Sequence, residues 1–262
     1  MTWDTFIYFA IAALIFWGIG AALALKSDKR TAPTMLTVVG LIVFMFFIIG
    51  LWISLERPPL RTMGETRLWY SLFLPLVGLI VYLRWHYKWI LSFSTILSCV
   101  FIIINIANPD IHNKALMPAL QSPWFTPHVI VYMFSYAVFG AVTLIAIYYL
   151  AKEDKISDHQ KIMDMSDNLV YVGIAFLTIG MLMGAIWAKI AWGHYWSWDP
   201  KETWAAITWL SYLIYIHYRL NKRSSNENAM IMLIVAFIFL QICWYGLNYL
   251  PSAQQSIHTY TN

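Results

Sequence analysis

The stretch WGHYWSWDPKETWAAITWL, from Trp192 to Leu210, holds five tryptophans in nineteen residues. Within it, Asp199 is followed by Pro200 and, three residues after the aspartate, by Glu202. Asp is a strong helix cap, Pro suits the first helical position and Glu completes a capping box, so a helix is expected to begin at about Pro200. The five tryptophans then divide between a loop (Trp192, Trp196, Trp198) and the helix (Trp204, Trp209).

The chain around this stretch has the composition of a membrane protein. It is 60% hydrophobic and only 11% charged over 262 residues, whereas soluble domains carry roughly 25% charged residues. Apolar runs near the ~20 residues that cross a bilayer as a helix recur at 5–25, 35–55, 68–84, 89–107, 128–150, 169–188, 201–219 and 229–248. The sequence therefore predicts an all-α integral membrane protein, a bundle of about eight transmembrane helices in a single domain over 1–262.

Several functional classes are disfavoured by the charges and the cysteines. The net charge of +4 sits in short loops between apolar runs, so it indicates topology and not nucleic-acid binding. The two cysteines, Cys99 and Cys243, each lie within an apolar run, and the chain has no CxxC, CxxCH or zinc spacing. Neither a disulfide scaffold nor a covalently attached heme is therefore encoded, and both cysteines are expected to be packing residues.

The distribution of Lys and Arg predicts the orientation in the membrane. Eleven of the 17 lie in one set of alternate loops, which includes the segment 152–161, and the other set has fewer. The richer side is expected to be cytoplasmic. Both termini and the tryptophan-rich turn at 192–209 then face outward, on the periplasmic side of a bacterial inner membrane.

The density of tryptophan in the turn has two interpretations. Trp and Tyr gather at both membrane surfaces, so an interfacial belt is one of them. Belts scatter their aromatic residues, however, and this group is concentrated, hinged at Gly193 and joined to a capped helix. A dense apolar platform suits a large planar ligand, of which heme is the obvious candidate.

The same residues carry a family resemblance. WGHYWSWDPKETWAAITWL resembles the tryptophan-rich WWD motif of heme-handling proteins, and its DPKETWA continuation is similar to the CcsA/ResC family of cytochrome c biogenesis proteins. Weaker similarity extends to MPALQSPWFTPHV at 117–129 and to QSIHTY near the C-terminus, and RPPLRTMGETRLW loosely resembles a family segment ending in a glutamate, here Glu65. Many members carry a small residue at His194 and a polar one at Ile190, which leaves open whether His194 is a bystander or an additional ligand.

The resemblance implies roles for three of the seven histidines. His128 and His258 match the two outer axial ligands of heme iron, and imidazole is a common axial donor. His217 lies seventeen residues after Pro200, about 25 Å along a helix, so it cannot reach the same iron, and the resemblance implies a second heme contact within the membrane. A histidine at the membrane interface is the alternative for His217. The remaining histidines in loops (His86, His112, His159) are expected to be solvated.

The function implied by the resemblance is that of a heme-handling membrane subunit of a system II cytochrome c synthetase. Heme b would be its substrate, contacted by the three histidines and by Trp192, Trp196, Trp198, Asp199 and Trp204. Asp199 is expected mainly to cap the helix. A CcsB/ResB-type partner with a large outer domain would complete the heme lyase activity, with apocytochrome c as acceptor. Delivery of heme to a carrier without attachment, or an unrelated small-solute transporter, are the alternatives. A transporter favours internal repeats and broken helices, and neither is visible.

Overall fold

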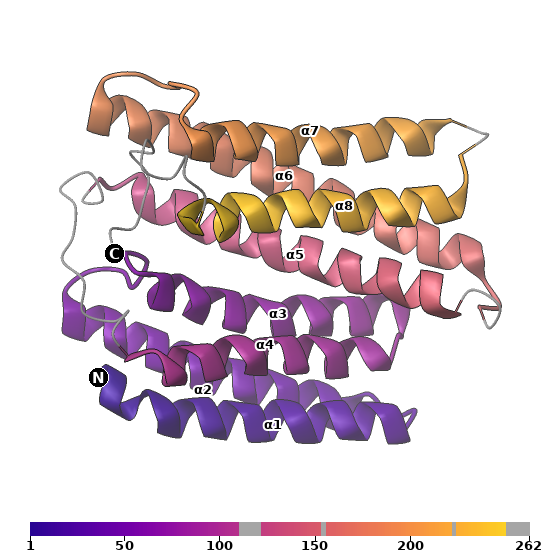
Figure 1. The fold of residues 1–262 in the computed structure, drawn as a ribbon. Helices are drawn as coiled ribbons and strands as arrows, with labels where there is room; N and C mark the ends of the chain where they lie inside the picture. The colour runs from indigo at the N-terminus through magenta and orange to yellow at the C-terminus, as the bar shows by residue number, and fades with distance from the viewer. Residues whose placement is uncertain (110–121, 153–155, 222–223, 250–262) are drawn as a thin grey trace. The chain divides into compact units, whose positions relative to one another are not determined.

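A computed structural model describes residues 1–109, 122–152, 156–221 and 224–249 of the chain. The described residues form eight α-helices and no strand, which confirms the all-α prediction (Figure 1). In chain order the helices are α1 (Phe6–Lys26), α2 (Thr31–Leu55), α3 (Met63–Trp85), α4 (Trp89–Ala107), α5 (Phe125–Lys152), α6 (His159–Trp192), α7 (Pro200–Leu220) and α8 (Asn226–Trp244), with short 3-10 segments at Trp3–Thr5 and Gly246–Tyr249.

Seven of these helices are long and apolar enough to cross a membrane, by length and composition, within the described part of the chain. The exception is α7, which has 21 residues and lies where a span was predicted, but is rich in Trp, Tyr and Thr. At 1.5 Å per residue α7 is about 31 Å long, close to the ~30 Å of a hydrocarbon core. The chain is thus a multi-pass membrane protein, and the eighth crossing stays a prediction.

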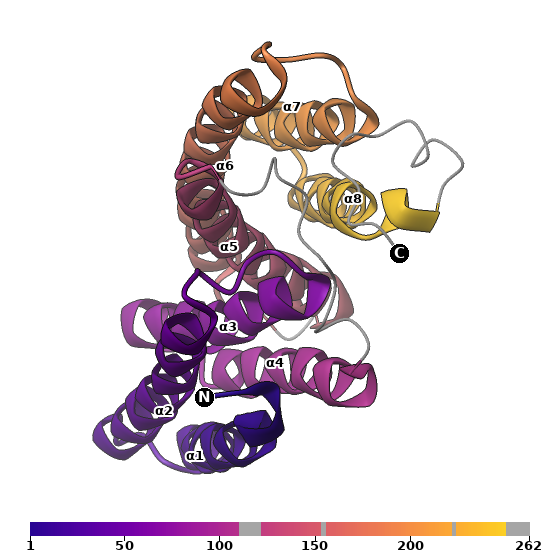
Figure 2. The same cartoon turned by 90° about the vertical axis from the view of Figure 1, so that its left-hand side faces the viewer.

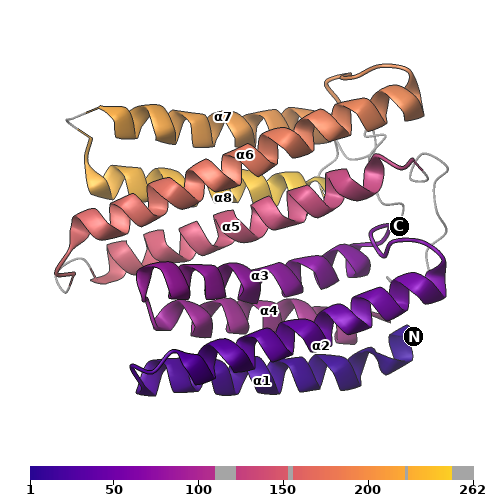
Figure 3. The ribbon, with the colours of Figure 1, turned by 180° about the vertical axis from the view of Figure 1, so that it is seen from behind.

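The helices group into two compact units, Met1–Leu116 with α1 to α4 and Met117–Asn262 with α5 to α8. Within each unit consecutive helices run antiparallel (Figures 1 and 3). In the second unit α5 contacts α6, α6 contacts α7, α7 contacts α8 and α8 contacts α5, so the four helices close into a ring (Figure 2). Whether the chain acts as one domain, as the sequence suggested, stays a prediction.

Of the helices that begin earlier than hydropathy predicted, α3 and α6 differ most, by five and ten residues, because polar residues form their first turns. In α3 the hydroxyl of Thr62 accepts from the backbone N–H of Glu65 and the Glu65 carboxylate accepts from the N–H of Thr62, a capping box that precedes the apolar run. In α6 the side chain of Asp158 caps the helix by accepting from the backbone N–H of Lys161 at 2.9 Å. The helix therefore begins at His159, ten residues before the predicted start.

Two expectations for individual residues need correction. Trp192 is not on the loop but is the last residue of α6, because the helix continues to Gly193 before it ends. His159 does not lie in a solvated loop either. It is the first residue of α6, half-buried, with its Nδ1 2.8 Å from the Tyr149 hydroxyl. His86 is exposed as expected, at the C-cap of α3.

The segment before α3 explains the glutamate that the family resemblance singled out. Glu65 is fully buried, and its carboxylate accepts from Arg57 at 2.8 and 3.0 Å and from the backbone of the RPPLRT segment. A buried carboxylate needs such compensation. Glu65 therefore holds the entry of α3 in place.

Candidate functional site

One end of the second unit collects most of the predicted site, and we call it the tryptophan end. It consists of the start of α5, the end of α6, the turn 193–199, the start of α7 and the end of α8 (Figures 1 and 3). A contact of 3.6 Å between the Cys243 sulfur and the carbonyl oxygen of Lys201 ties α8 to α7 at this end. His128 and the tryptophan-rich turn therefore lie at the same end of one four-helix unit.

The turn leaves α6 through a glycine. Gly193 has φ of +87°, a left-handed conformation that glycine adopts without steric cost, and its N–H donates to the carbonyl of Lys189 at 3.0 Å. The Lys189 ammonium in turn donates to the carbonyl of Gly193 at 2.7 Å and lies 5.5 Å from the centre of the Tyr195 ring. The exit from α6 is thus fixed by both backbone and side chain.

The start of α7 follows the predicted capping box. The Asp199 side chain accepts from the N–H of Lys201 at 2.8 Å, and Glu202 accepts from the N–H of Asp199 at 3.2 Å, with Pro200 at the first helical position. Both acidic residues are buried. The structure therefore confirms that Asp199 is a helix cap.

The tryptophans of the turn and of α7 fall into two groups. Trp196 and Trp198 lie on the turn with ring centres 5.7 Å apart and planes at 84°. On the helix, Trp204 packs against Phe239 of α8, and the indole N–H of Trp209 donates to the Thr178 hydroxyl of α6 at 2.9 Å. Trp204 and Trp209 therefore join α7 to its neighbours, while Trp196 and Trp198 lie on the turn at the tryptophan end.

The geometry of the turn differs from a flat platform. Rings at 84° cannot both lie against one planar ligand, so only one of them can stack while the other presents an edge. Trp198 is 70% exposed, whereas Trp196 is half-buried and its indole nitrogen has no hydrogen-bond partner in the described part of the chain. Trp198 is the ring with a free face.

His128 is held in a fixed orientation near the start of α5. Its Nδ1 lies 2.7 Å from the carbonyl oxygen of Gly180 on α6, and its ring stacks on Trp187 at 5.8 Å between centres. Because a carbonyl oxygen only accepts, Nδ1 must carry the proton, and in the neutral imidazole Nε2 then carries the lone pair. Histidines that bind metals are commonly oriented by such a second hydrogen bond.

The sequence did not predict the partners of His128. Trp187 stacks on His128 and contacts Phe125 and Trp192, with ring centres 5.0 and 4.8 Å apart. A Cβ added at Gly184 would lie 2.6 Å from the His128 ring, so the helices approach closely there. The small residues at 180, 184 and 188 repeat every four positions, a spacing that favours close helix contact and could have indicated this face.

His217 lies far from this end, in the last turn of α7. Its side chain is exposed, and its Nδ1 lies 2.8 Å from the carbonyl oxygen of Leu213, so Nδ1 carries a proton and the neutral ring has its lone pair on Nε2. The opposite face of α7 is buried through Tyr215 and Arg219, which both donate to Asp167 of α6. His217 therefore points away from the core of its own unit.

The other predicted residues are placed as follows. His194 is exposed on the turn. His258 and His112 lie outside the described residues, so their positions relative to the tryptophan end stay predictions. Within the described ranges no group of three or more His, Cys, Asp and Glu could hold a bare metal ion. Heme iron needs only one or two axial donors, so this finding does not bear on heme.

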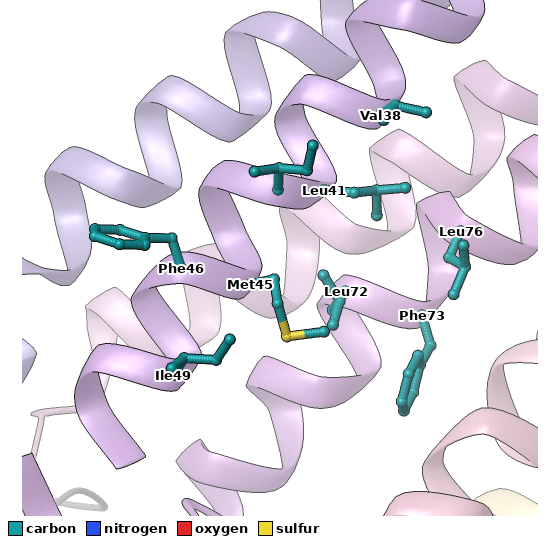
Figure 4. Close-up of a pocket in the computed structure, with 9 residues that line it drawn as sticks. Val38, Leu41, Met45, Phe46, Ile49, Leu72, Phe73 and Leu76 are labelled. Atoms are coloured by element: carbon teal, nitrogen blue, oxygen red, sulfur yellow. The ribbon is translucent and has the colours of Figure 1, made fainter. Parts of the chain in front are cut away.

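An apolar groove of about 380 Å³ lies elsewhere, between α2 and α3 of the first unit (Figure 4). Apolar side chains alone line it, among them Met45 and Phe46 of α2 and Phe73 of α3. It offers no imidazole and no charged group, so it has no histidine ligand for iron and no partner for a charged substituent. The groove is not the predicted site.

Comparison with known proteins identifies the family. The family of cytochrome C assembly proteins matches residues 5–254. The chain belongs to this family. It is 32% identical to the cytochrome c biogenesis protein CcsA of Nymphaea alba, over 90% of this chain and 87% of that protein, and 33% identical to CcsA of Cuscuta exaltata, over 80% of each. CcsA of Chlamydomonas reinhardtii is 41% identical over 55% of this chain and 42% of its own length.

The family assignment confirms the resemblance drawn from the tryptophan-rich turn and gives the chain a role in cytochrome c biogenesis. The match covers α1 to α8, so membership does not rest on the turn alone. It also makes a general small-solute transporter a poor description of the chain.

Proposed function

We propose that this member of the cytochrome c assembly family binds heme b at the tryptophan end of its second unit and presents it for attachment to apocytochrome c. The observation that carries the proposal is the orientation of His128. Its Nδ1–H is engaged by Gly180, its ring is backed by Trp187, and its Nε2 has the lone pair that an iron ligand needs. The exposed ring of Trp198 is at the same end.

His258 is the second axial ligand in this proposal. The support comes from its place in the short tail after α8 and from the family resemblance, since the residue itself lies outside the described part. Two imidazoles would fill both axial positions of the iron and limit its reaction with oxygen. Trp198 and Trp196 would contact the ring, Trp192 would support Trp187, and Asp199 and Trp204 would act by fixing the turn and α7.

His217 supplies a second heme contact within the membrane. About 25 Å of helix separates it from the turn, so it would meet heme at an earlier stage than His128 does. An exposed histidine in a membrane helix that points away from its own unit is a functional candidate. A CcsB/ResB-type partner, or lipid, would cover that face of α7.

The reaction joins two cysteine thiols of a CxxCH segment to the two vinyl groups of heme. Each S–H adds across one C=C bond, so sulfur bonds to one carbon, hydrogen to the other, and no leaving group forms. The chain would contribute position and axial ligation, while heme and the thiols supply the bonds. The lyase activity would then belong to a system II synthetase formed with the partner subunit.

The proposal includes an orientation. Both termini and the tryptophan-rich turn would face the outer side of a bacterial cytoplasmic membrane, as the excess of Lys and Arg in the other loops indicates. Attachment outside the cytoplasm requires the tryptophan end on that side.

Purification of the full-length chain with its visible absorption spectrum is the test. Heme that copurifies, with a six-coordinate reduced spectrum that His128→Ala loses, supports the proposal. A chain that purifies intact without heme under heme-replete expression would refute it. Co-expression with the partner and a cytochrome reporter separates attachment from delivery, since delivery to a carrier gives bound heme without a covalent product.

A further inference from the structure

We propose that Glu202 is a positioning residue for the tryptophan-rich turn, because its carboxylate clamps the backbone on both sides of Trp198 and so holds the Trp198 indole outward for heme. The inference rests on the proposed function for the identity of the ligand. The clamp itself is a property of the heme-free chain and can be measured without heme.

The clamp uses one carboxylate oxygen. Oε2 of Glu202 accepts from the backbone N–H of Ser197 at 2.7 Å, from the Ser197 hydroxyl at 3.2 Å and from the backbone N–H of Asp199 at 3.2 Å. Ser197 and Asp199 are the two neighbours of Trp198. The first turn of α7 also reaches Trp198 itself, because the Thr203 hydroxyl donates to its carbonyl oxygen at 3.2 Å. Three consecutive residues are therefore held from α7.

Trp198 needs such a clamp because of its backbone conformation. Its φ is +60°, in the left-handed region that residues with a large side chain rarely adopt. A conformation of this kind persists only where the surroundings impose it. The Trp198 side chain is 70% exposed, so its own packing contributes little. The hydrogen bonds from α7 to residues 197–199 therefore hold the left-handed conformation of Trp198.

The contacts of Glu202 go beyond helix capping. A capping box requires only the bond to the N–H of Asp199. The two bonds to Ser197 lie before the cap and do nothing for the helix, yet they include the shortest of the three. Glu202 is also buried, which strengthens each bond relative to the same bond in water. Its position therefore serves the turn as well as α7.

The experiment compares Glu202→Ala with Glu202→Gln. All three donors use a single oxygen, and the glutamine carbonyl can take its place without the charge. Asp158→Ala is the matched control, because Asp158 caps α6 by the same chemistry at the other end of the same unit. Each full-length variant carries 5-fluorotryptophan, and the fluorine resonances of Trp196 and Trp198 are assigned with single Trp→Phe variants.

In the heme-free state Glu202→Ala is expected to shift or broaden the Trp198 resonance, whereas Glu202→Gln and Asp158→Ala leave it near the wild-type position. Titration with hemin should then show about a two- to tenfold weaker affinity for Glu202→Ala, the factor that loss of one aromatic contact gives. Glu202→Gln should recover most of this affinity.

The outcomes separate the clamp from the proposed function. An unchanged Trp198 resonance in Glu202→Ala would overturn the clamp, whatever happens to hemin binding. Equal loss of affinity in the Gln and Ala variants would also overturn it, because the charge would then be the property that matters. A displaced resonance with unchanged hemin affinity would instead leave the clamp standing and refute the ring contact of the proposed function.

Discussion

The Nδ1 atom of His128 on α5 lies 2.7 Å from the carbonyl oxygen of Gly180 on α6. This relationship fixes the orientation of the ring and places the proton on Nδ1. It depends on α6 having no side chain at Gly180 and Gly184, where a Cβ would meet Tyr132 and His128. The orientation of His128 therefore depends on the packing of α5 against α6. Substitutions on α5, at His128, and on α6, at Gly184, can both test it.

Removal of the imidazole should open one coordination position. His128→Ala is expected to replace the six-coordinate reduced spectrum by a five-coordinate one and to speed oxidation of bound heme, since one axial donor is lost. His258→Ala should do the same. Added imidazole should enter the gap and restore the spectrum, which visible spectroscopy of the purified variants measures. His194→Ala is the control with little expected change. If His194→Ala lost the spectrum and His128→Ala kept it, the ligand assignment would be wrong.

Displacement of the imidazole should weaken ligation without removing it. In Gly184→Ala the new Cβ would lie 2.6 Å from Cε1 of His128, so the ring must move. Gly173→Ala is matched, because its Cβ would lie 2.6 Å from a ring carbon of Phe139 on the same pair of helices. Both should lose about 1–3 kcal/mol of unfolding free energy by overpacking, measured by thermal unfolding. Only Gly184→Ala should also alter the heme spectrum, and an identical spectral change in Gly173→Ala would contradict the assignment.

Loss of the indoles from the turn should lower heme content. Replacing Trp196 and Trp198 together by alanine removes the exposed ring face, and phenylalanine at both positions should retain part of the effect because area and flat shape carry much of it. The expected loss for the alanine pair is about tenfold or more in affinity, from two aromatic contacts of roughly 1 kcal/mol each. Trp52→Ala, which removes a partly exposed tryptophan of the first unit, is the control. Equal effects from Trp52 and from the pair would favour an interfacial belt.

The sequence predicts the fold well where a single local signal decides it. Long apolar runs predict helices, and the DPKE pattern predicts a start of α7 at about Pro200, where the helix does begin, because capping depends only on neighbours in the chain. Where polar residues continue a helix beyond its apolar run, hydropathy fails. The segment 159–168 is polar, yet it forms the first turns of α6 behind the Asp158 cap.

The site is predicted only in part, for the same reason. His128 and the tryptophans of the turn can be chosen from motif residues, but the bonds that orient them join residues distant in sequence. Gly180 is 52 positions from His128 and carries no side chain to signal its role. The ring of Trp198 stands at 84° to that of Trp196, and Trp198 has a left-handed backbone conformation that its side chain does not signal.

Asp167 should be a major source of stability at the far end of the second unit. Its carboxylate accepts from Tyr215 at 2.7 Å and from the Arg219 guanidinium at 3.0 to 3.2 Å, and both charged side chains are mostly buried. Asp167→Ala leaves Arg219 without its partner, which should cost about 3 kcal/mol, at the lower end of the range for broken buried pairs. Thermal unfolding measures this loss. Asp164→Ala, an exposed neighbour one turn away, should change stability by less than about 0.5 kcal/mol.

The topology can be tested independently of heme. A reporter fused after His258 should register the outer compartment, and one inserted in the segment 152–161 should register the cytoplasm, because the Lys-rich loops are expected inside. Paired reporters active only in one compartment measure this for each fusion. The Gly193 turn is expected to match the C-terminal fusion, since α7 and α8 run antiparallel between them. If the fusion after His258 and the insertion at 152–161 registered the same compartment, the three helices between them, α6, α7 and α8, could not all cross the membrane. Because α5 separates His128 from the segment 152–161, His128 and His258 would then face opposite sides, and their joint assignment as axial ligands would fail.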